Sequence, residues 1–320
     1  MNSIPIINAT NKAGISYINT AMNDEKREVY DIVSEIISRK SELDNAPHIL
    51  CTGMNPGVVN IWARHGIEKF SVPEEIIHFE YDTSRVAAKW EPTVTWSLKE
   101  FLMETVIDPT GIMLGRNKLK KLLPNGLENK RPLKPILSPI MKLDKYPYGF
   151  TVLHEENITL AQRYNIPSKF IYAVNMKTME KIMKTYKEKK KITEKDLSHG
   201  DNSEKILSGS DNVGVVLDYK DKRVYYFNSM PNEAVIGTNA TYAQVITGVL
   251  AALFTMIFDK PKIGINFPED LYDSYFRNYL FDNLRTQEYI FRKKKGKLLL
   301  KSYNPQIRTN ITGNFKRILF

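Results

Sequence analysis

Residues 51–60 read Cys-Thr-Gly-Met-Asn-Pro-Gly-Val-Val-Asn (CTGMNPGVVN), and they join an apolar, strand-like segment to a helix-like one. PHIL (47–50) comes before them, and apolar residues recur at helical spacing in IWARHGIEKF (61–70) after them. A proline suits the first helical turn, and Asn55 before it suits an extended N-cap. Gly57 permits a close approach to the backbone, and the free amides of a helix start can face a ligand. The stretch predicts a strand–turn–helix unit, either a plain connection or one that presents its turn to a ligand.

The residues around this unit continue the alternation of strands and helices. A short strand is predicted at 13–18 and an amphipathic helix at 24–43, so strand and helix alternate up to residue 70. This order is typical of an α/β fold with a doubly wound parallel sheet. Downstream, the pattern predicts a β-hairpin at 211–230 and a strongly apolar helix at 241–258.

The composition is that of a basic globular protein. Of the 320 residues, 42% are hydrophobic and 26% are charged, and the formal net charge is +10. The single cysteine, Cys51, excludes an internal disulfide and a cysteine-based zinc site, and it favours a reducing, cytoplasmic compartment. The N-terminal residues do not have the pattern of a signal peptide. The apolar run at 245–258 is expected to be a buried helix, too short to cross a bilayer, so no membrane association is predicted.

Two lysine-rich segments, 183–196 and 291–301, make nucleic acid a partner to consider. Neither segment carries an interleaved ladder of aromatic residues, and the first is mixed with glutamate. Such runs are more typical of solvated faces, so nucleic-acid binding is kept as an alternative only.

Several short clusters carry residues that could do chemistry. Glu80 and Asp82 share one face of a predicted strand in HFEYDTS, because strand side chains alternate. Each of these residues alone more often has a structural role, and the absence of His-x-x-x-His spacing argues against a metal site. The further candidates are Trp96 and Glu104 in VTWSLKEFLMET, His154 and Glu156 in VLHEENITLA, and Asp211 at the start of the predicted hairpin.

Together these segments resemble the homospermidine synthase family, part of the saccharopine-dehydrogenase-like group of NAD(P) enzymes. The similar segments lie in that family's order between about residues 13 and 290, and they are GMNPGVV, FEYDTS, VTWSLKEFLMET, GFTVLHEENITLA, DNVGVVL…VYYFNS and NATYAQVITGVLAAL. The resemblance implies tightly bound NAD that serves as a hydride store. Putrescine is oxidised to an imine, ammonia leaves, a second diamine attacks, and reduction of the new imine gives homospermidine.

The resemblance also implies roles for individual residues. Glu80 and Glu104 would anchor ammonium groups, and Trp96 would make a cation–π contact. An amine must lose a proton before it attacks, which requires a nearby base. His154, Glu156 and Asp211 would position the amines and move protons, Asn55 would lie beside the nicotinamide, and Thr20, Asn55, Pro56 and Gly57 would contact the cofactor.

The chain departs from this family in two respects. It contains no Gly-x-Gly-x-x-Gly fingerprint, and the family's first hundred or so residues have no counterpart. Asn19 and Asn23 stand where the family has acidic residues. The chain is therefore expected to be a fragment, a degenerate relative, or one partner of a separate chain that supplies the missing NAD-binding half.

We expect a truncated Rossmann-type parallel sheet plus a mixed α+β part. Residues 1–70 would be the remnant of the NAD-binding domain, completed by about 241–290. Residues 71–240 would form the domain for substrate binding and dimerisation, followed by a basic C-terminal segment at 291–320. A homodimer is expected by resemblance.

A dication as substrate conflicts with a net charge of +10, so we predict an acidic pocket on an otherwise basic molecule. Two alternatives remain. One is a basic protein that binds nucleic acid or protein, with both lysine-rich segments on one continuous face. The other is a saccharopine-dehydrogenase-like oxidoreductase with a different amino substrate, which would be favoured if Trp96 lay outside the pocket.

Overall fold

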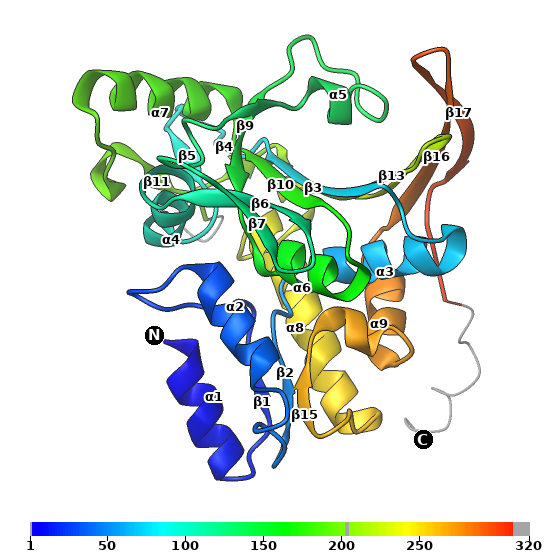
Figure 1. Ribbon diagram of the computed structural model, residues 1–320. Helices are drawn as coiled ribbons and strands as arrows, with labels where there is room; N and C mark the ends of the chain where they lie inside the picture. Colours follow the sequence, from blue (N-terminus) through cyan, green and yellow to red (C-terminus); the bar gives the residue numbers. More distant parts are fainter. Residues whose placement is uncertain (1, 202–204, 310–320) are drawn as a thin grey trace.

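The computed structural model of the chain describes residues 2–201 and 205–309. Its two main sheets lie one below the other in Figure 1, with helices around them. The helices are α1 (Ser3–Lys12), α2 (Val29–Ser38), α3 (Val58–Phe70), α4 (Leu98–Leu102) with a π-helical continuation η1 (Met103–Ile107), α5 (Lys134–Leu137), α6 (Glu155–Tyr164), α7 (Met176–Lys189), α8 (Ala240–Phe258) and α9 (Tyr275–Asn283).

The smaller sheet is parallel and has three strands. Its order is β1 (Tyr17–Ile18), β2 (Pro47–Ile49) and β15 (Gly264–Asn266). The chain thus leaves this sheet after β2 and returns to it more than 200 residues later. Strand β15 could not be predicted from the sequence, because three residues are too few to show a strand periodicity. Helix α1, which precedes β1, was not anticipated either.

The larger sheet has ten strands and is mixed. Its path runs β17 (Lys297–Asn304), β16 (Gln287–Lys294), β14 (Lys222–Pro231), β13 (Ser210–Asp218), β3 (Glu75–Asp82), β10 (Ser168–Ala173), β6 (Thr110–Gly115) and β7 (Lys118–Leu122). Off this path, β9 (Tyr148–Val152) pairs with β10, and β8 (Arg131–Pro132) pairs with β9. Strands β3 and β10 are parallel, whereas β13 pairs antiparallel with both β3 and β14. A parallel sheet beside a mixed sheet confirms the predicted α/β fold class, and the hairpin predicted at 211–230 is β13–β14.

Strand β3 is buried on both faces, and this decides where its acidic residues lie. Ile76 packs with the cluster around α3, while Ile77 and Phe79 pack into a different cluster on the opposite face. Because side chains alternate along a strand, Glu80 and Asp82 share the face of Ile76. That face meets the predicted strand–turn–helix unit, which is β2 and α3.

Helix α8 is more exposed than the sequence predicts. It starts at Ala240, is 19 residues long, and is long and apolar enough to cross a membrane by length and composition, with a mean hydropathy of 1.7. Only 28% of that stretch is buried, so the expectation of a buried helix is wrong. Its buried face carries small or polar residues such as Gln244 and Gly248, and large apolar residues such as Ile246 and Leu253 are exposed.

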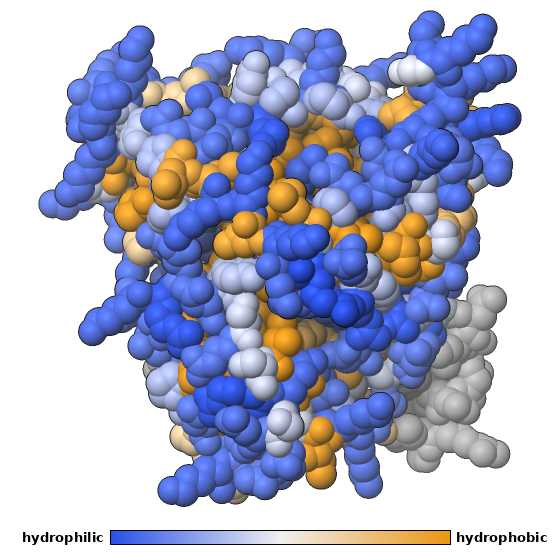
Figure 2. Space-filling view, in the orientation of Figure 1, coloured by the Kyte–Doolittle hydropathy of each residue, from blue (hydrophilic) through white to orange (hydrophobic). Residues whose placement is uncertain are grey.

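The two lysine-rich segments lie on different parts of the surface. Helix α7 and the β16–β17 hairpin carry most of the lysines of these two segments, and they lie on opposite sides of the molecule in Figure 1. Residues 310–320 of the predicted basic C-terminal segment lie outside the described residues. On the face seen in Figure 2, hydrophilic residues cover most of the surface and hydrophobic residues form patches between its upper and lower parts.

Candidate functional site

A cavity of about 820 Å³ lies where the loops after β1 and β2 face the end of β3 and the helices α4 and α6. It brings together residues from nine separate stretches of the chain. Of the residues singled out in the sequence, those that line it are Thr20, Asn55, Pro56, Glu80, Trp96, Glu104, His154 and Asp211. Gly57 and Glu156 lie behind this lining.

The turn at 53–57 is closed by the chain itself. Gly57, and not Asn55, is the N-cap of α3, and its backbone amide donates to the side chain of Asn60 at 3.0 Å. Gly57 has a φ of 135°, and a Cβ there would lie 2.0 Å from the carbonyl oxygen of Gly53. The glycine is therefore required by the closure of the turn rather than by the approach of a ligand. The turn, with Asn55 and Pro56 in a cis peptide bond, faces the cavity.

Asn55 and Glu80 form a pair at the cavity wall. Asn55 Nδ2 donates to Glu80 Oε2 at 2.8 Å, and Asn55 Oδ1 is buried without a hydrogen-bond partner. Burial, reinforced by the charge of Asp82, raises the pKa of Glu80 to about 8. Glu80 is thus a carboxyl group that is largely protonated at neutral pH.

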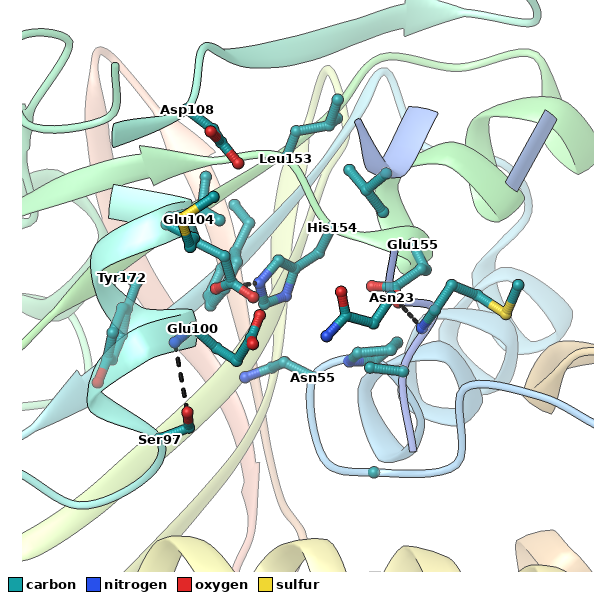
Figure 3. Close-up of a pocket in the computed structure, with 18 of the residues that line it drawn as sticks. Asn23, Asn55, Ser97, Glu100, Glu104, Asp108, Leu153, His154, Glu155 and Tyr172 are labelled. Carbon is teal, nitrogen blue, oxygen red and sulfur yellow. Dashed lines mark hydrogen bonds and ion pairs between the residues drawn. The ribbon is translucent and has the colours of Figure 1, made fainter. Parts of the chain in front are cut away.

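His154 lies between two carboxylates. It precedes α6, and its Nε2 is 3.0 Å from Glu104 Oε2, while its Nδ1 is 3.7 Å from Glu156 Oε1. Figure 3 shows the side chains of Glu104 and His154 facing each other. Burial lowers the pKa of His154, but the charges of Glu104 and Glu156 outweigh it and raise the pKa well above its ordinary value. The ring is therefore held as an imidazolium.

Glu156 is fully buried and reaches the cavity only through His154. Burial raises its pKa, but the charge of His154 outweighs this effect and lowers the pKa below its usual range. The structure therefore places Glu156 as a support for His154 rather than as a group that touches a substrate.

Trp96 forms part of an aromatic wall. Its indole Nε1 donates to the hydroxyl of Tyr172 at 3.0 Å, and its ring centroid lies 6.3 Å from those of Tyr172 and Phe101. Trp96 is only partly buried and lines the cavity. Tyr172 lines the same wall and was not identified from the sequence, because β10 looks like any buried strand.

Acidic residues dominate the lining. Nine aspartates and glutamates face the cavity, against three lysines and arginines, which confirms the predicted acidic pocket on a basic chain. The members that the sequence analysis missed are Asp24, Glu25, Glu28, Glu100, Asp108 and Glu155. Burial raises the pKa of Glu155 to about 7, and its Oε1 accepts a hydrogen bond from the backbone amide of Met22. Among these six residues, only Glu100 had a signal in the sequence. Its i, i+4 spacing from Glu104 on a helix could have placed it on the same wall.

Asn19 and Asn23, which were expected at positions of acidic residues, have different surroundings. Asn19 joins β1 to β2, because its Oδ1 accepts a hydrogen bond from the amide of Cys51 at 2.8 Å. Asn23 lines the cavity, and Figure 3 shows it close to Asn55 and Glu155. The acidic neighbours of Asn23, Asp24 and Glu25, restore negative charge to this side of the cavity.

A metal ion does not fit the site well. His154, Glu155 and Glu156 offer ligand atoms within 4.8 Å of one another. However, a histidine ligand must be neutral and offer a free nitrogen, and both nitrogens of His154 face carboxylates. An imidazolium between carboxylates accounts for the same geometry.

The cavity suits the nicotinamide end of a nicotinamide dinucleotide but not its pyrophosphate. Ligands of parallel sheets lie outside the carboxyl ends of the strands, and Thr20, Asn55 and Pro56 occupy that position after β1 and β2. The unpaired Asn55 Oδ1 can accept a hydrogen bond from a carboxamide. After β1, however, the lining residues Asp24 and Glu25 repel a pyrophosphate, and none of the described lining residues there is a glycine that could cradle it.

Comparison with known proteins agrees with this architecture. No family model and no curated protein matches the sequence. Among solved structures, saccharopine dehydrogenase (L-Glu forming) from Saccharomyces cerevisiae matches 89% of this chain and 81% of its own, with a TM-score of 0.53 and 9% identity. A candidate oxidoreductase from Parabacteroides merdae matches 80% of this chain and 61% of its own, with a TM-score of 0.26 and 8% identity. The first of these likenesses shows that the chain has a saccharopine-dehydrogenase-like fold of the Rossmann type.

Proposed function

We propose that the cavity binds a small diamine and that the chain is a homospermidine-synthase-like protein. The reaction would join two putrescine molecules through imine intermediates into homospermidine, with release of ammonia. The observation that carries the proposal is the excess of nine acidic over three basic residues in the cavity of a chain with net charge +10. The electric field of these acidic residues attracts a cation into the cavity, although the net positive charge of the whole molecule repels it at long range.

The arrangement of the lining suits a diamine better than a single cation. Glu80 and Asp211 offer carboxyl oxygens on neighbouring strands, and Glu104 offers another from the facing helix. Trp96 supplies an aromatic face, and its contact with a cation is worth about 0.5–2 kcal/mol, depending on desolvation. Two ammonium groups four carbons apart could therefore each meet a carboxyl group, with the chain between them along the aromatic wall.

The ionised form of Glu80, a minority at neutral pH, is suited to accept a proton from a bound amine. An alkylammonium has a pKa of about 10, so a free carboxylate is a weak base towards it. The pKa of about 8 for Glu80 narrows this gap and makes the transfer less unfavourable. His154, held as an imidazolium, would donate a hydrogen bond or a proton to a leaving amine. NAD, when bound with its nicotinamide beside Asn55 and Thr20, would supply the acceptor and later the donor of the hydride.

The alternatives are less well supported. An oxidoreductase that acts on an amino acid would need cationic groups for the substrate carboxylates, and the lining has few of them. Trp96 lies on the cavity, as the diamine proposal requires. A binding protein that uses both lysine-rich segments would need them on one face, and Figure 1 shows α7 and the β16–β17 hairpin on opposite sides.

The proposal is tested by binding first and by turnover second. Titration calorimetry would compare putrescine with 1,4-butanediol, which has the same length without charge, and with L-lysine, which adds a carboxylate. We expect putrescine to bind and butanediol not to bind. Trp96→Leu is expected to weaken putrescine binding about 2- to 30-fold. Stronger binding of lysine than of putrescine would favour the amino acid oxidoreductase.

Turnover is measured by incubating the purified chain with NAD and putrescine and detecting homospermidine and ammonia by mass spectrometry and an ammonia assay. Equal amounts of the two products without net formation of NADH are expected. Putrescine binding without any product would limit the proposal to a diamine-binding relative that lacks the activity.

A further inference from the structure

Two buried aspartates on neighbouring strands are joined by two threonine hydroxyl groups. Asp82 ends β3, and Asp211 lies opposite it on β13. Thr95 Oγ1 is 2.7 Å from Asp82 Oδ2 and 2.9 Å from Thr241 Oγ1. Thr241 Oγ1 is in turn 2.8 Å from Asp211 Oδ2. Asp82, Thr95 and Asp211 are buried. Asp211 and Thr241 also line the cavity.

The hydrogens in this chain of contacts can be counted. Three oxygen–oxygen contacts at hydrogen-bond distance require three hydrogens, and the two hydroxyl groups supply only two. With both carboxyl groups ionised, each threonine would donate to its own aspartate, and the two hydroxyl oxygens would face each other without a hydrogen. The geometry therefore requires one further proton, which must be on a carboxyl group.

The partners of the two carboxyl groups decide where that proton rests. Asp82 accepts hydrogen bonds at both oxygens, from Thr95 and from the backbone amide of Ser84 at 2.8 Å. Asp211 has a side-chain partner only at Oδ2, the hydroxyl of Thr241, and its Oδ1 is buried without a partner. A carboxylate is stabilised by the donors around it, so the negative charge belongs on Asp82 and the proton on Asp211.

We propose that Asp82 and Asp211 share one proton through Thr95 and Thr241, so that Asp211 becomes the anion only when a cation binds at its unpaired oxygen. On binding, Asp211 passes its proton to Thr241, Thr241 passes its own to Thr95, and Thr95 passes its own to Asp82. No proton leaves the protein, and the pair has one negative charge before and after. The resting arrangement stands on the geometry alone, whereas the shift on binding rests on the proposed function.

The neighbouring groups favour a single charge on this pair. Burial, followed by the charges of Glu80 and Asp82, raises the pKa of Asp211 well above its ordinary value. Burial also raises the pKa of Asp82, although Ser84 and Thr95 oppose the rise. The titratable groups that face the pair from other elements include Tyr172 on β10, whose pKa is also raised, and His154 beyond Glu80. A negative pair can thus hold a cation without two adjacent buried charges in the empty state.

Infrared spectroscopy of the full chain, labelled with carbon-13 aspartate, tests the resting state at pH 7 without any ligand. We expect the carbonyl band of a protonated aspartic acid in the wild type. Asp211→Asn should remove this band, and Thr241→Val, which keeps the shape of the side chain, should shift it. Thr247→Val is the matched control on α8, because its hydroxyl bonds only within the helix, and it should leave the band unchanged. A wild type without the band, or a band that Asp211→Asn or Thr241→Val leaves unaltered, overturns the proposal.

The movement of the proton from Asp211 to Asp82 is tested by adding putrescine to the same samples. In the wild type the band should persist at a changed frequency, because the proton moves to Asp82. In Asp82→Asn the band should disappear on binding, because no carboxylate is left to receive the proton. A band that stays unchanged in either protein with putrescine bound overturns the shift. If calorimetry detects no putrescine binding, the proposed function fails, while the measurement without ligand still decides the resting arrangement.

Discussion

At the scale of single residues, the site is governed by charges that are buried together. His154 is the clearest example, because its two nitrogens face Glu104 and Glu156 and its ring is only 12% exposed. The sequence identified all three residues, yet it could not show that one of the two glutamates faces the cavity and the other the interior. Their different roles follow from position alone.

Replacing Glu104 by Gln is expected to lower the pKa of His154. The variant removes the nearer of two negative charges that favour the imidazolium, so a drop of about one unit or more is expected. A proton NMR titration of the His154 ring measures it. Glu100→Gln, one turn earlier on the same wall, is the control and should leave the titration unchanged. An equal pKa in wild type and Glu104→Gln would contradict the charged pair.

Replacing Glu80 by Gln is expected to stabilise the ligand-free protein at alkaline pH. The folded-state pKa of about 8 exceeds the unfolded value of about 4.3, so the folded protein binds more protons between these values. The contribution of Glu80 to stability is therefore complete below about pH 4 and is lost as the pH rises to about 8.

Urea unfolding of Glu80→Gln at several pH values measures this effect. At pH 8 the variant should exceed the wild type by about 4–5 kcal/mol, and the difference should vanish towards pH 4. Glu188→Gln, on the exposed face of α7, should show no such trend. A pH-independent difference would mean that Glu80 is already ionised in the folded protein.

At the scale of elements, α8 and the turn at 53–57 hold each other in place. A Cβ on Gly248 would lie 2.2 Å from the carbonyl oxygen of Thr52 and 2.5 Å from that of Gly53. The helix therefore packs its glycine directly on the backbone that leads into Asn55. The small residues on the buried face of α8 are explained by this close approach.

Gly248→Ala is expected to push α8 away from this turn. The overpacking should cost about 1–3 kcal/mol of unfolding free energy, because backbone atoms cannot rotate away as a side chain can. Thermal and urea unfolding measure the loss. Thr247→Ala, the neighbouring position on the same helix, is the control for a change of helix composition. A Gly248→Ala protein as stable as the wild type would show that the approach is looser than described.

At the scale of the whole molecule, the outer face of α8 bears on the expected homodimer, which remains a prediction. Ile246, Leu253 and Ile257 are between 43% and 55% exposed and lie at helical spacing, and no charged residue occurs in α8. Apolar stripes of this kind are unusual on monomers. A second copy of the chain could bury the stripe by packing its own α8 against it.

Ile246→Glu combined with Leu253→Glu is expected to convert such a dimer into monomers, because it places charges in the apolar contact. Size-exclusion chromatography with light scattering measures the mass. Leu123→Glu, which is 67% exposed in the unrelated loop after β7, should leave the mass unchanged. A monomeric wild type would rule out the dimer.

Features that depend on neighbours along the chain could be predicted from the residues alone. The periodicity at 61–70 and the alternation at 211–230 specified α3 and the β13–β14 hairpin, because the apolar face of a helix or strand is a local pattern. The chemistry-bearing residues could be named for the same reason, since their segments are short and contiguous.

Features that depend on segments far apart in the chain emerged only from its folding in space. Folding inserted β15 beside β2, turned the apolar side of α8 outwards, and placed Thr95 and Thr241 between two aspartates. It also gathered acids from separate segments, such as Asp24 and Glu155, around one cavity. Strand register and helix packing set these distances, and burial then sets the pKa values, so none of them is encoded in a local stretch of sequence.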